Sequence, residues 1–315
     1  MIFDTHAHYD DEQFDTDRDA LLRGMAEQNV GTIINVGASL EGCWRSVELA
    51  HQYPFVYAAV GIHPDEVGDL NEESFARLRE TARMEEKVVA IGEIGLDYHW
   101  DVQPHEVQKY WFVKQMELAK ELDLPIAVHS RDAAKDTFDL IADRGKGQRG
   151  VIHCYSYSPE MAQEYVKLGY HIGLGGVVTF KNAKKAKETA RQIPLERILL
   201  ETDSPYMAPT PFRGKRNNSA YIDYVAQEIA DLKGISKEEV IAVTEENAKK
   251  LFAIISVENT PTSARTPLKK SLSCAKTVQD KVCLYVLQCY ILYAKTVFQW
   301  RPASGSNNKS HVRST

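Results

Sequence analysis

The chain has 315 residues, of which 43% are hydrophobic and 26% are charged, and this composition is ordinary for a globular enzyme. The first residues lack a basic region followed by an apolar run, and no stretch offers about 18 uninterrupted apolar residues, so we expect neither a signal peptide nor a membrane span. The five cysteines form no C-x-x-C pair, which disfavours a disulfide framework and a thiolate zinc site and favours a reducing, cytoplasmic location.

The net charge of −6 is unevenly distributed along the chain. Residues 257–315 contain nine Lys or Arg and two acids, so they carry +7 and residues 1–256 carry −13. A body this acidic does not indicate nucleic-acid binding by its overall charge. Any phosphate-binding site must therefore be a local basic patch.

Apolar runs alternate with amphipathic segments from the first residue to about residue 203. The runs predicted as strands are 1–8, 31–37, 55–62, 88–93, 125–129, 150–153, 170–175 and 198–203. The segments predicted as helices are 17–28, 41–52, 72–85, 104–121, 133–143, 159–168 and 183–192, followed by 220–232 and 237–251. Continuously apolar strands indicate parallel strands buried on both faces. Eight repeats favour an α/β fold of the TIM-type (β/α)8 barrel kind, with extra C-terminal helices.

The composition changes after Ile254. Residues 257–280 are rich in Ser, Thr, Pro and Lys without a clear period, which predicts a solvated linker. Residues 282–298 are apolar and β-prone, and they could bind a partner, cover the core, or form an appendage without function, which we favour. We therefore divide the chain into a barrel domain of residues 1–256 and a basic, irregular extension of residues 257–315.

Histidines and acids occur where the predicted strands end, and the carboxyl ends of the strands form the active face of such a barrel. His6 and His8 are two residues apart on an extended backbone, so both rings point to one side and could chelate a divalent metal. An isolated His-x-His pair is as often two histidines at the end of a strand. The other polar residues that end predicted strands are His63, Glu93, His129, His153 and Asp203.

Glu93 is the candidate bridge between two metals. A two-metal hydrolytic site needs carboxylates and imidazoles around cations about 3.5–4 Å apart, and the two oxygens of one carboxylate match that separation. A carboxylate that ends an apolar strand is costly to bury without a cation, and apart from Arg131 no Lys or Arg lies near it in sequence. Asp203 is the same case on the eighth strand, and it could also accept the proton of the attacking water.

His129 and His153 would each more often be hydrogen-bonded core histidines. Together with Glu93, however, they complete a second set of three ligands. His63 could orient a phosphate or support another ligand from behind.

Two basic loops follow the seventh and eighth predicted strands, so they would lie over the carboxyl ends of the strands, where the candidate metal ligands are. We expect Arg213, Lys215 and Arg216 to hold substrate phosphates, whereas the lysines of residues 184–187 are better explained as a solvated helix face. The aromatic residues available to stack a base are Phe180, Tyr206 and Phe212.

Six short motifs occur in order along this part of the chain. They are FDTHAH at 3–8, GIHP at 61–64, GEIGLDY at 92–98, HSR at 129–131, HCYS at 153–156 and LETDSPY at 200–206. Together they resemble the signatures of the TatD family of metal-dependent deoxyribonucleases, over residues 1 to about 254, and none departs from the pattern.

The resemblance implies an amidohydrolase-type barrel that hydrolyses phosphodiester bonds in DNA with two divalent ions per subunit, such as Mg²⁺, Mn²⁺ or Zn²⁺. It would place one metal on His6, His8, Glu93 and Asp203. The other metal would lie on Glu93, His129 and His153.

We therefore expect a cytoplasmic deoxyribonuclease that uses a water activated by two metals, with Asp203 and Glu93 as catalytic residues, and that trims DNA ends as an exonuclease. RNA is an alternative substrate, and we expect no membrane and no obligate protein partner. One alternative function is an amidohydrolase acting on a small lactone, amide or phosphotriester. Many such relatives bridge their metals with a carboxylated lysine, and Glu93 at that position favours the nuclease. A non-catalytic binding module is disfavoured because no expected ligand is missing.

Overall fold

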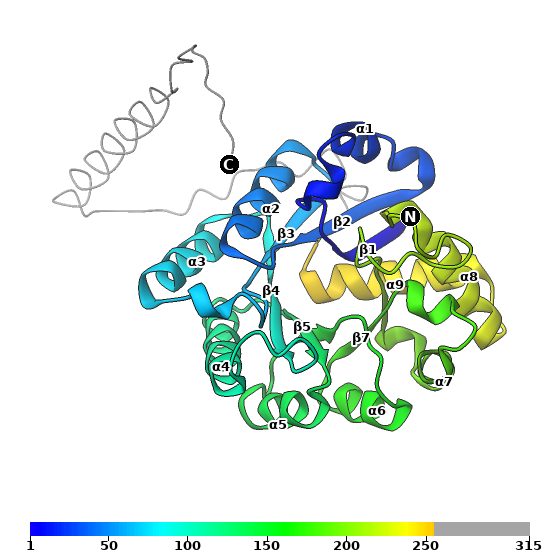
Figure 1. Cartoon of the computed structure of the whole chain (residues 1–315). Coiled ribbons are helices and arrows are strands. Elements are labelled where there is room, and N and C mark those ends of the chain that lie inside the picture. The colour runs from blue at the N-terminus through cyan, green and yellow to red at the C-terminus, as the bar shows by residue number, and fades with distance from the viewer. Residues whose placement is uncertain (255–315) are drawn as a thin grey trace, which may run out of the picture. The chain divides into compact units, whose positions relative to one another are not determined.

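The computed structural model describes residues 1–254, which form eight parallel strands surrounded by helices (Figure 1). The strands are β1 (Ile2–Ala7), β2 (Val30–Val36), β3 (Val56–Val60), β4 (Val88–Asp97), β5 (Ile126–Arg131), β6 (Gly150–Ile152), β7 (His171–Leu174) and β8 (Ile198–Leu200). Each strand pairs in parallel with the next one in chain order. The predicted TIM-type barrel is therefore confirmed.

Helices follow the strands and form the outer layer of the barrel. They are α1 (Arg18–Arg23), α2 (Leu40–Gln52), α3 (Glu72–Met84), α4 (His105–Glu121), α5 (Ala134–Arg144), α6 (Pro159–Lys167), α7 (Lys184–Gln192), α8 (Ile222–Lys233) and α9 (Lys237–Phe252). Polar side chains begin several of them: Ser39, Asn71, Ser158 and Ser236 each accept a backbone N–H from the first turn of α2, α3, α6 and α9. Within residues 1–254, no helix is long and apolar enough to cross a membrane.

Helix α9 closes one end of the barrel (Figure 1). Its buried residues Leu251 and Phe252 pack with inward-facing residues of the strands, and the ring of Phe252 stacks on that of Phe3 with centroids 6.2 Å apart. Because this end is filled with apolar side chains, polar residues are gathered at the opposite end, where the strands finish.

The seam between β8 and β1 is made by the segments that follow these two strands. Ala7 pairs with Ser204 in a parallel bridge, and the backbone N–H of Asp203 donates to the His6 carbonyl at 2.9 Å. Asp4, fully buried, accepts hydrogen bonds from the Thr202 hydroxyl at 2.7 Å and from the Ser219 hydroxyl at 2.6 Å. The seam thus fixes Asp203 beside His6 and His8.

Two predicted elements differ from the structure, whereas the other predicted bounds agree within about three residues. The prediction that β4 ends at Glu93 is wrong: the strand continues to Asp97, because residues 94–97 pair with residues 128–131 of β5. The predicted first helix stops at Arg23, where Gly24, a poor helix former, follows, and a 3-10 turn at Ala26–Gln28 replaces its second half. The extension of residues 257–315 lies outside the described residues.

We expect a chain that ends at Val257 to fold as stably as the full chain, because residues 1–254 contain all eight strands and the helix that closes the barrel. The midpoint of thermal unfolding should shift by less than about 3 °C, which corresponds to roughly 1 kcal/mol for a domain of this size.

The matched control is a chain that ends at Lys250 and so lacks Leu251 and Phe252, which are 4% and 3% exposed. It should be less stable by several kcal/mol, since loss of one buried Phe side chain alone costs about 3–5 kcal/mol. If the chain that ends at Val257 does not fold, the extension completes the core.

Candidate metal centre

The candidate ligands gather at the open end of the barrel, around a cavity of about 630 Å³. His8, His63, Glu93, His129, His153 and Asp203 line this cavity. His6, at 1% exposure, lies beneath them. The structure thus brings together residues that are up to 197 positions apart in the chain.

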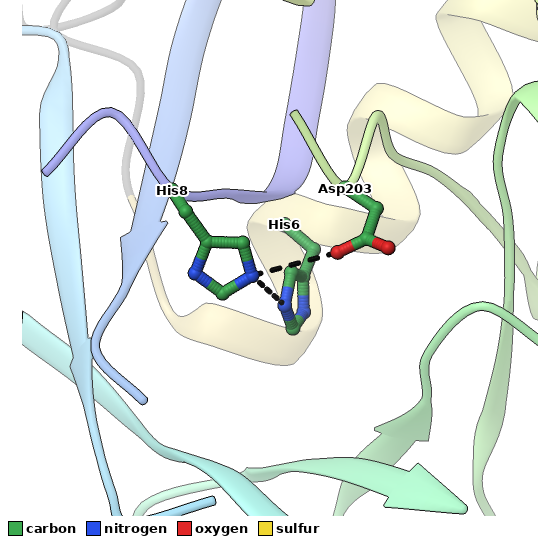
Figure 2. Close-up of side chains that lie close together, drawn as sticks. All are labelled: His6, His8 and Asp203. Carbon is green, nitrogen blue, oxygen red and sulfur yellow. Dashed lines mark hydrogen bonds and ion pairs between the residues drawn. The ribbon is translucent and has the colours of Figure 1, made fainter. Parts of the chain in front are cut away.

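The first group consists of His6, His8 and Asp203. The Nε2 atoms of His6 and His8 lie 3.2 Å apart, and His8 Nε2 is 3.4 Å from Asp203 Oδ1. Figure 2 shows the ring of His8 turned toward both His6 and Asp203. The Nδ1 atom of His8 is 2.7 Å from the Val36 carbonyl oxygen. Since a carbonyl only accepts, Nδ1 carries a proton, and whenever the ring is neutral its Nε2 lone pair faces the group.

The second group consists of His129 and His153, from the ends of β5 and β6. His129 Nδ1 and His153 Nε2 lie 3.3 Å apart. Both atoms face the same carboxylate oxygen, Glu93 Oε1, at 2.9 Å and 2.7 Å. His63 Nε2 is farther from this oxygen, at 3.9 Å.

Glu93 stands between the two groups. While Oε1 faces His129 and His153, Oε2 lies 3.5 Å from His6 Nε2 and 3.6 Å from His8 Nε2. Glu93 is only 4% exposed, and every ion-pair contact that it makes within residues 1–254 is with a histidine. Burial acts to raise the pKa of its carboxyl, but the neighbouring imidazoles, led by His153, hold that pKa well below its ordinary value.

The nearby carboxylates and imidazoles shift the pKa values of these histidines in opposite directions. Burial acts to lower the pKa of His8 and of His129, but the carboxylates of Asp203, Glu93 and Asp97 raise these values to about 10 and about 9. Burial and the neighbouring imidazoles lower the pKa of His6 to about 4, so its ring is neutral near pH 7. Positive charge is therefore favoured between the carboxylates, whether a proton or a metal ion carries it.

Two carboxylates behind the histidines were not among the residues predicted from the sequence. Asp97 Oδ2 lies 3.0 Å from His129 Nε2, while Asp97 Oδ1 accepts the backbone N–H of His99 at 2.8 Å and that of Trp100 at 3.2 Å. Asp97 thus fixes the ring whose other nitrogen faces Glu93. A signal for it exists in the sequence: residues an even number apart on a strand share a face, and Asp97 is four residues after Glu93.

Glu201 occupies the corresponding position behind His153. Its carboxylate is fully buried, accepts the backbone N–H of Cys154, and has one oxygen 4.0 Å from His153 Nδ1. Burial raises the pKa of Glu201 to about 8. Gly173 makes room for it, because a Cβ at that position would lie 2.3 Å from Glu201 Oε2.

The three basic residues predicted to bind substrate do not line the cavity. Arg216 donates to both carboxylate oxygens of Asp17, at 2.8 and 2.5 Å, and its guanidinium lies over the ring of Phe14. Arg213 lies over the ring of Phe180, 4.4 Å from its centroid. Their role, and that of Lys215, stays a prediction, and Arg216 would have to leave Asp17 to fulfil it.

The family model described as TatD related DNase matches residues 3–253. The chain belongs to the TatD family. The resemblance carried by the six motifs is therefore confirmed.

Relatives of this TatD-family chain match it across the whole barrel. The uncharacterized metal-dependent hydrolase YabD of Bacillus subtilis (strain 168) is 46% identical over 255 residues, which are 81% of this chain and 100% of that protein. The uncharacterized metal-dependent hydrolase YcfH of Escherichia coli (strain K12) is 36% identical over 81% of this chain and 96% of its own length. The crystal structure of the TatD homolog YjjV from Escherichia coli K12 superposes with a TM-score of 0.76 at 33% identity, covering 81% of this chain and 98% of that one. This TatD-family protein is thus a metal-dependent hydrolase.

We expect Asp97→Asn to weaken metal binding by about 10–100-fold, the usual effect of losing the partner that orients a histidine ligand. The replacement keeps the size of the side chain but removes the negative charge beside His129 Nε2. Calorimetric titration of metal-free protein with Mn²⁺ or Zn²⁺ measures the affinity directly.

Asp11→Asn is the matched control, because Asp11 lines the same cavity and carries the same charge but contacts Tyr206 rather than a histidine. An equal loss of affinity in both variants would mean that Asp97 acts only through its charge. An unchanged affinity in Asp97→Asn would remove its positioning role.

Proposed function

We propose that this protein is a deoxyribonuclease that holds two divalent cations, with the carboxylate of Glu93 between them. The observation that carries the proposal is that the two carboxylate oxygens of Glu93 face different pairs of histidines. Oε2 faces His6 and His8, and Oε1 faces His129 and His153. With Asp203 beside His8, one cation would be held by His6, His8, Glu93 and Asp203. The other cation would take Glu93, His129 and His153.

The side chains present fit such a pair of cations. Imidazole nitrogens and carboxylate oxygens are ligands for Zn²⁺, Mn²⁺ and related ions. The donor atoms of His6, His8 and Asp203 all lie within 4.8 Å of one another, and so do those of His6, Glu93 and His153, which is close enough for each set to hold an ion. Two divalent ions, when bound, supply Lewis-acid polarisation of a phosphodiester and activation of a water.

The charge of the cavity also argues for cations. Its lining includes six carboxylates, from Asp10, Asp11, Asp65, Glu93, Asp97 and Asp203. Arg131 is the only Lys or Arg among the described residues that line it. A polyanionic substrate would be repelled by this surface unless bound metal ions outweigh the acids. Dependence on metal for binding as well as for chemistry follows from this balance.

In this proposal, Asp203 accepts the proton released from the attacking water. Its side chain lines the cavity and is 17% exposed, and one carboxylate oxygen faces His8. Burial acts to raise the pKa of Asp203, but the hydrogen bond to His8 and the nearby imidazoles lower it below its ordinary value. The carboxylate is therefore ionised near pH 7 and can accept a proton at that oxygen.

Incubation of metal-reconstituted protein with end-labelled single- and double-stranded DNA and RNA tests this function. We expect DNA to be shortened stepwise from one end, in keeping with an exonuclease, and chelation by EDTA to abolish cleavage until Mg²⁺ or Mn²⁺ is restored. The ladder reports substrate, polarity and mode together. If no nucleic acid is cut with any of these metals while a small lactone or phosphotriester is hydrolysed, the alternative amidohydrolase function is correct.

Replacing Glu93 with Gln should lower the content of both metals, because one substitution removes the charge shared by both ligand groups. Turnover should fall by more than about 100-fold, since even an outer partner of a ligand is worth about 10–100-fold. Equilibrium dialysis followed by elemental analysis gives the number of ions per chain. A Glu93→Gln protein that keeps two metals and most of its rate would show that Glu93 is not a bridge, and Asp11→Asn again controls for the loss of one cavity charge.

A further inference from the structure

An exposed tryptophan lies at the mouth of the metal cavity. Trp100, in the loop after β4, is 62% exposed and lines the same cavity as Glu93 and Asp203. Leaving so large an apolar ring in water forgoes the stabilisation that burial would give. Tyr206 and Met207, 50% and 43% exposed, line the same cavity, and exposed apolar side chains gathered at one cavity indicate a binding site.

Neighbouring groups hold this ring in place. The backbone N–H of Trp100 donates to Asp97 Oδ1, and the ring of His99 meets the indole edge-on, with centroids 4.9 Å apart and an interplanar angle of 85°. The guanidinium of Arg131 lies 5.3 Å from the centre of the indole. The backbone of Trp100 is thus held by Asp97, the residue that also orients His129.

Arg131 supplies the positive charge beside this ring. It is the last residue of β5, two positions after His129, and its guanidinium makes no ion pair or hydrogen bond within residues 1–254. In a cavity with six lining carboxylates, such a cation is available to an incoming anion. An aromatic face next to a free guanidinium matches the two parts of a nucleotide, a flat base and a phosphate.

The other aromatic residues near the basic loops are less suited to this role. Phe212 is stacked on Tyr221, with centroids 4.1 Å apart and planes 8° from parallel. Phe180 has Arg213 over its ring, as Trp100 has Arg131, but it does not line the metal cavity. Tyr206 does line the cavity and is half exposed, but its hydroxyl donates to Asp11 at 2.8 Å, and no Lys or Arg among residues 1–254 lies over its ring.

We propose that Trp100 and Arg131 form a nucleotide subsite, in which an unpaired base of the DNA stacks on the indole and the adjacent phosphate binds the guanidinium. The inference rests on the proposed deoxyribonuclease function and assigns to it a substrate contact outside the metal ligands. The subsite recognises the flat face that every base offers, so it selects for the presence of a base rather than for its sequence.

The test compares two single-stranded oligonucleotides in one reaction. They have the same length and different end labels, and in one of them tetrahydrofuran residues without bases replace the three nucleotides around the cleaved bond. For Trp100→Ala, kcat/KM on the base-bearing DNA should fall by about 5- to 150-fold, the usual value of one base stacked on an aromatic ring. On the abasic DNA it should stay within about twofold of the parent, and Trp100→Phe should recover most of the loss.

Trp44→Ala is the matched control, because Trp44 is a partly exposed tryptophan of α2 that does not line the cavity. It should leave both substrates unaffected. Arg131→Gln should weaken both substrates alike and flatten the log–log salt dependence of DNA binding by about 0.7, the value of one phosphate contact on a single strand. The metal content of every variant should equal that of the parent.

The outcomes separate this inference from the function on which it rests. If the parent hydrolyses DNA but Trp100→Ala slows both oligonucleotides equally, or behaves like Trp44→Ala, the stacking role is wrong and the deoxyribonuclease function stands. An unchanged salt slope in Arg131→Gln removes the phosphate contact. If the parent hydrolyses neither oligonucleotide, the proposed function fails and the subsite fails with it.

Discussion

The structure depends on one buried carboxylate and on what neutralises it. Glu93 is 4% exposed at the centre of the open end of the barrel, and its ion-pair partners among residues 1–254 are histidine rings. An ionised carboxylate buried without positive charge costs several kcal/mol. Protons on the rings can supply that charge, and so can metal ions, which have the advantage of serving both oxygens at once. The fold therefore provides a site whose stability and chemistry are both linked to cations.

The barrel delivers this arrangement through its strand ends and its seam. His6 lies in β1, His8 directly follows it, and Asp203 comes from the segment after β8, so the hydrogen bonds that join these segments set the first group of candidate ligands. In the second group, Asp97 orients the ring of His129 from behind, while Glu201 lies 4.0 Å behind His153. Asp97 also accepts the backbone N–H of Trp100, so one carboxylate positions both the tryptophan at the mouth of the cavity and His129 inside it.

The sequence predicts the barrel and the converging residues well, for a physical reason. Parallel strands buried on both faces are continuously apolar, so a polar residue at the end of such a run is conspicuous, as His129 and His153 are. The length of β4 could not be read in this way, because residues 94–97 are set by pairing with β5. Neither could the use of Arg216, whose partner Asp17 is 199 positions away. Loop side chains such as Trp100 take their roles from tertiary contacts that local patterns do not encode.

The most direct test of the account is a crystal structure of the protein reconstituted with Mn²⁺, with the ions located by anomalous scattering. The account predicts two peaks on opposite sides of the Glu93 carboxylate, about 3.5–4 Å apart. One peak should contact His6, His8 and Asp203, and the other His129 and His153. A single peak, or two peaks that share the same oxygen of Glu93 while the other oxygen contacts no metal, would contradict it.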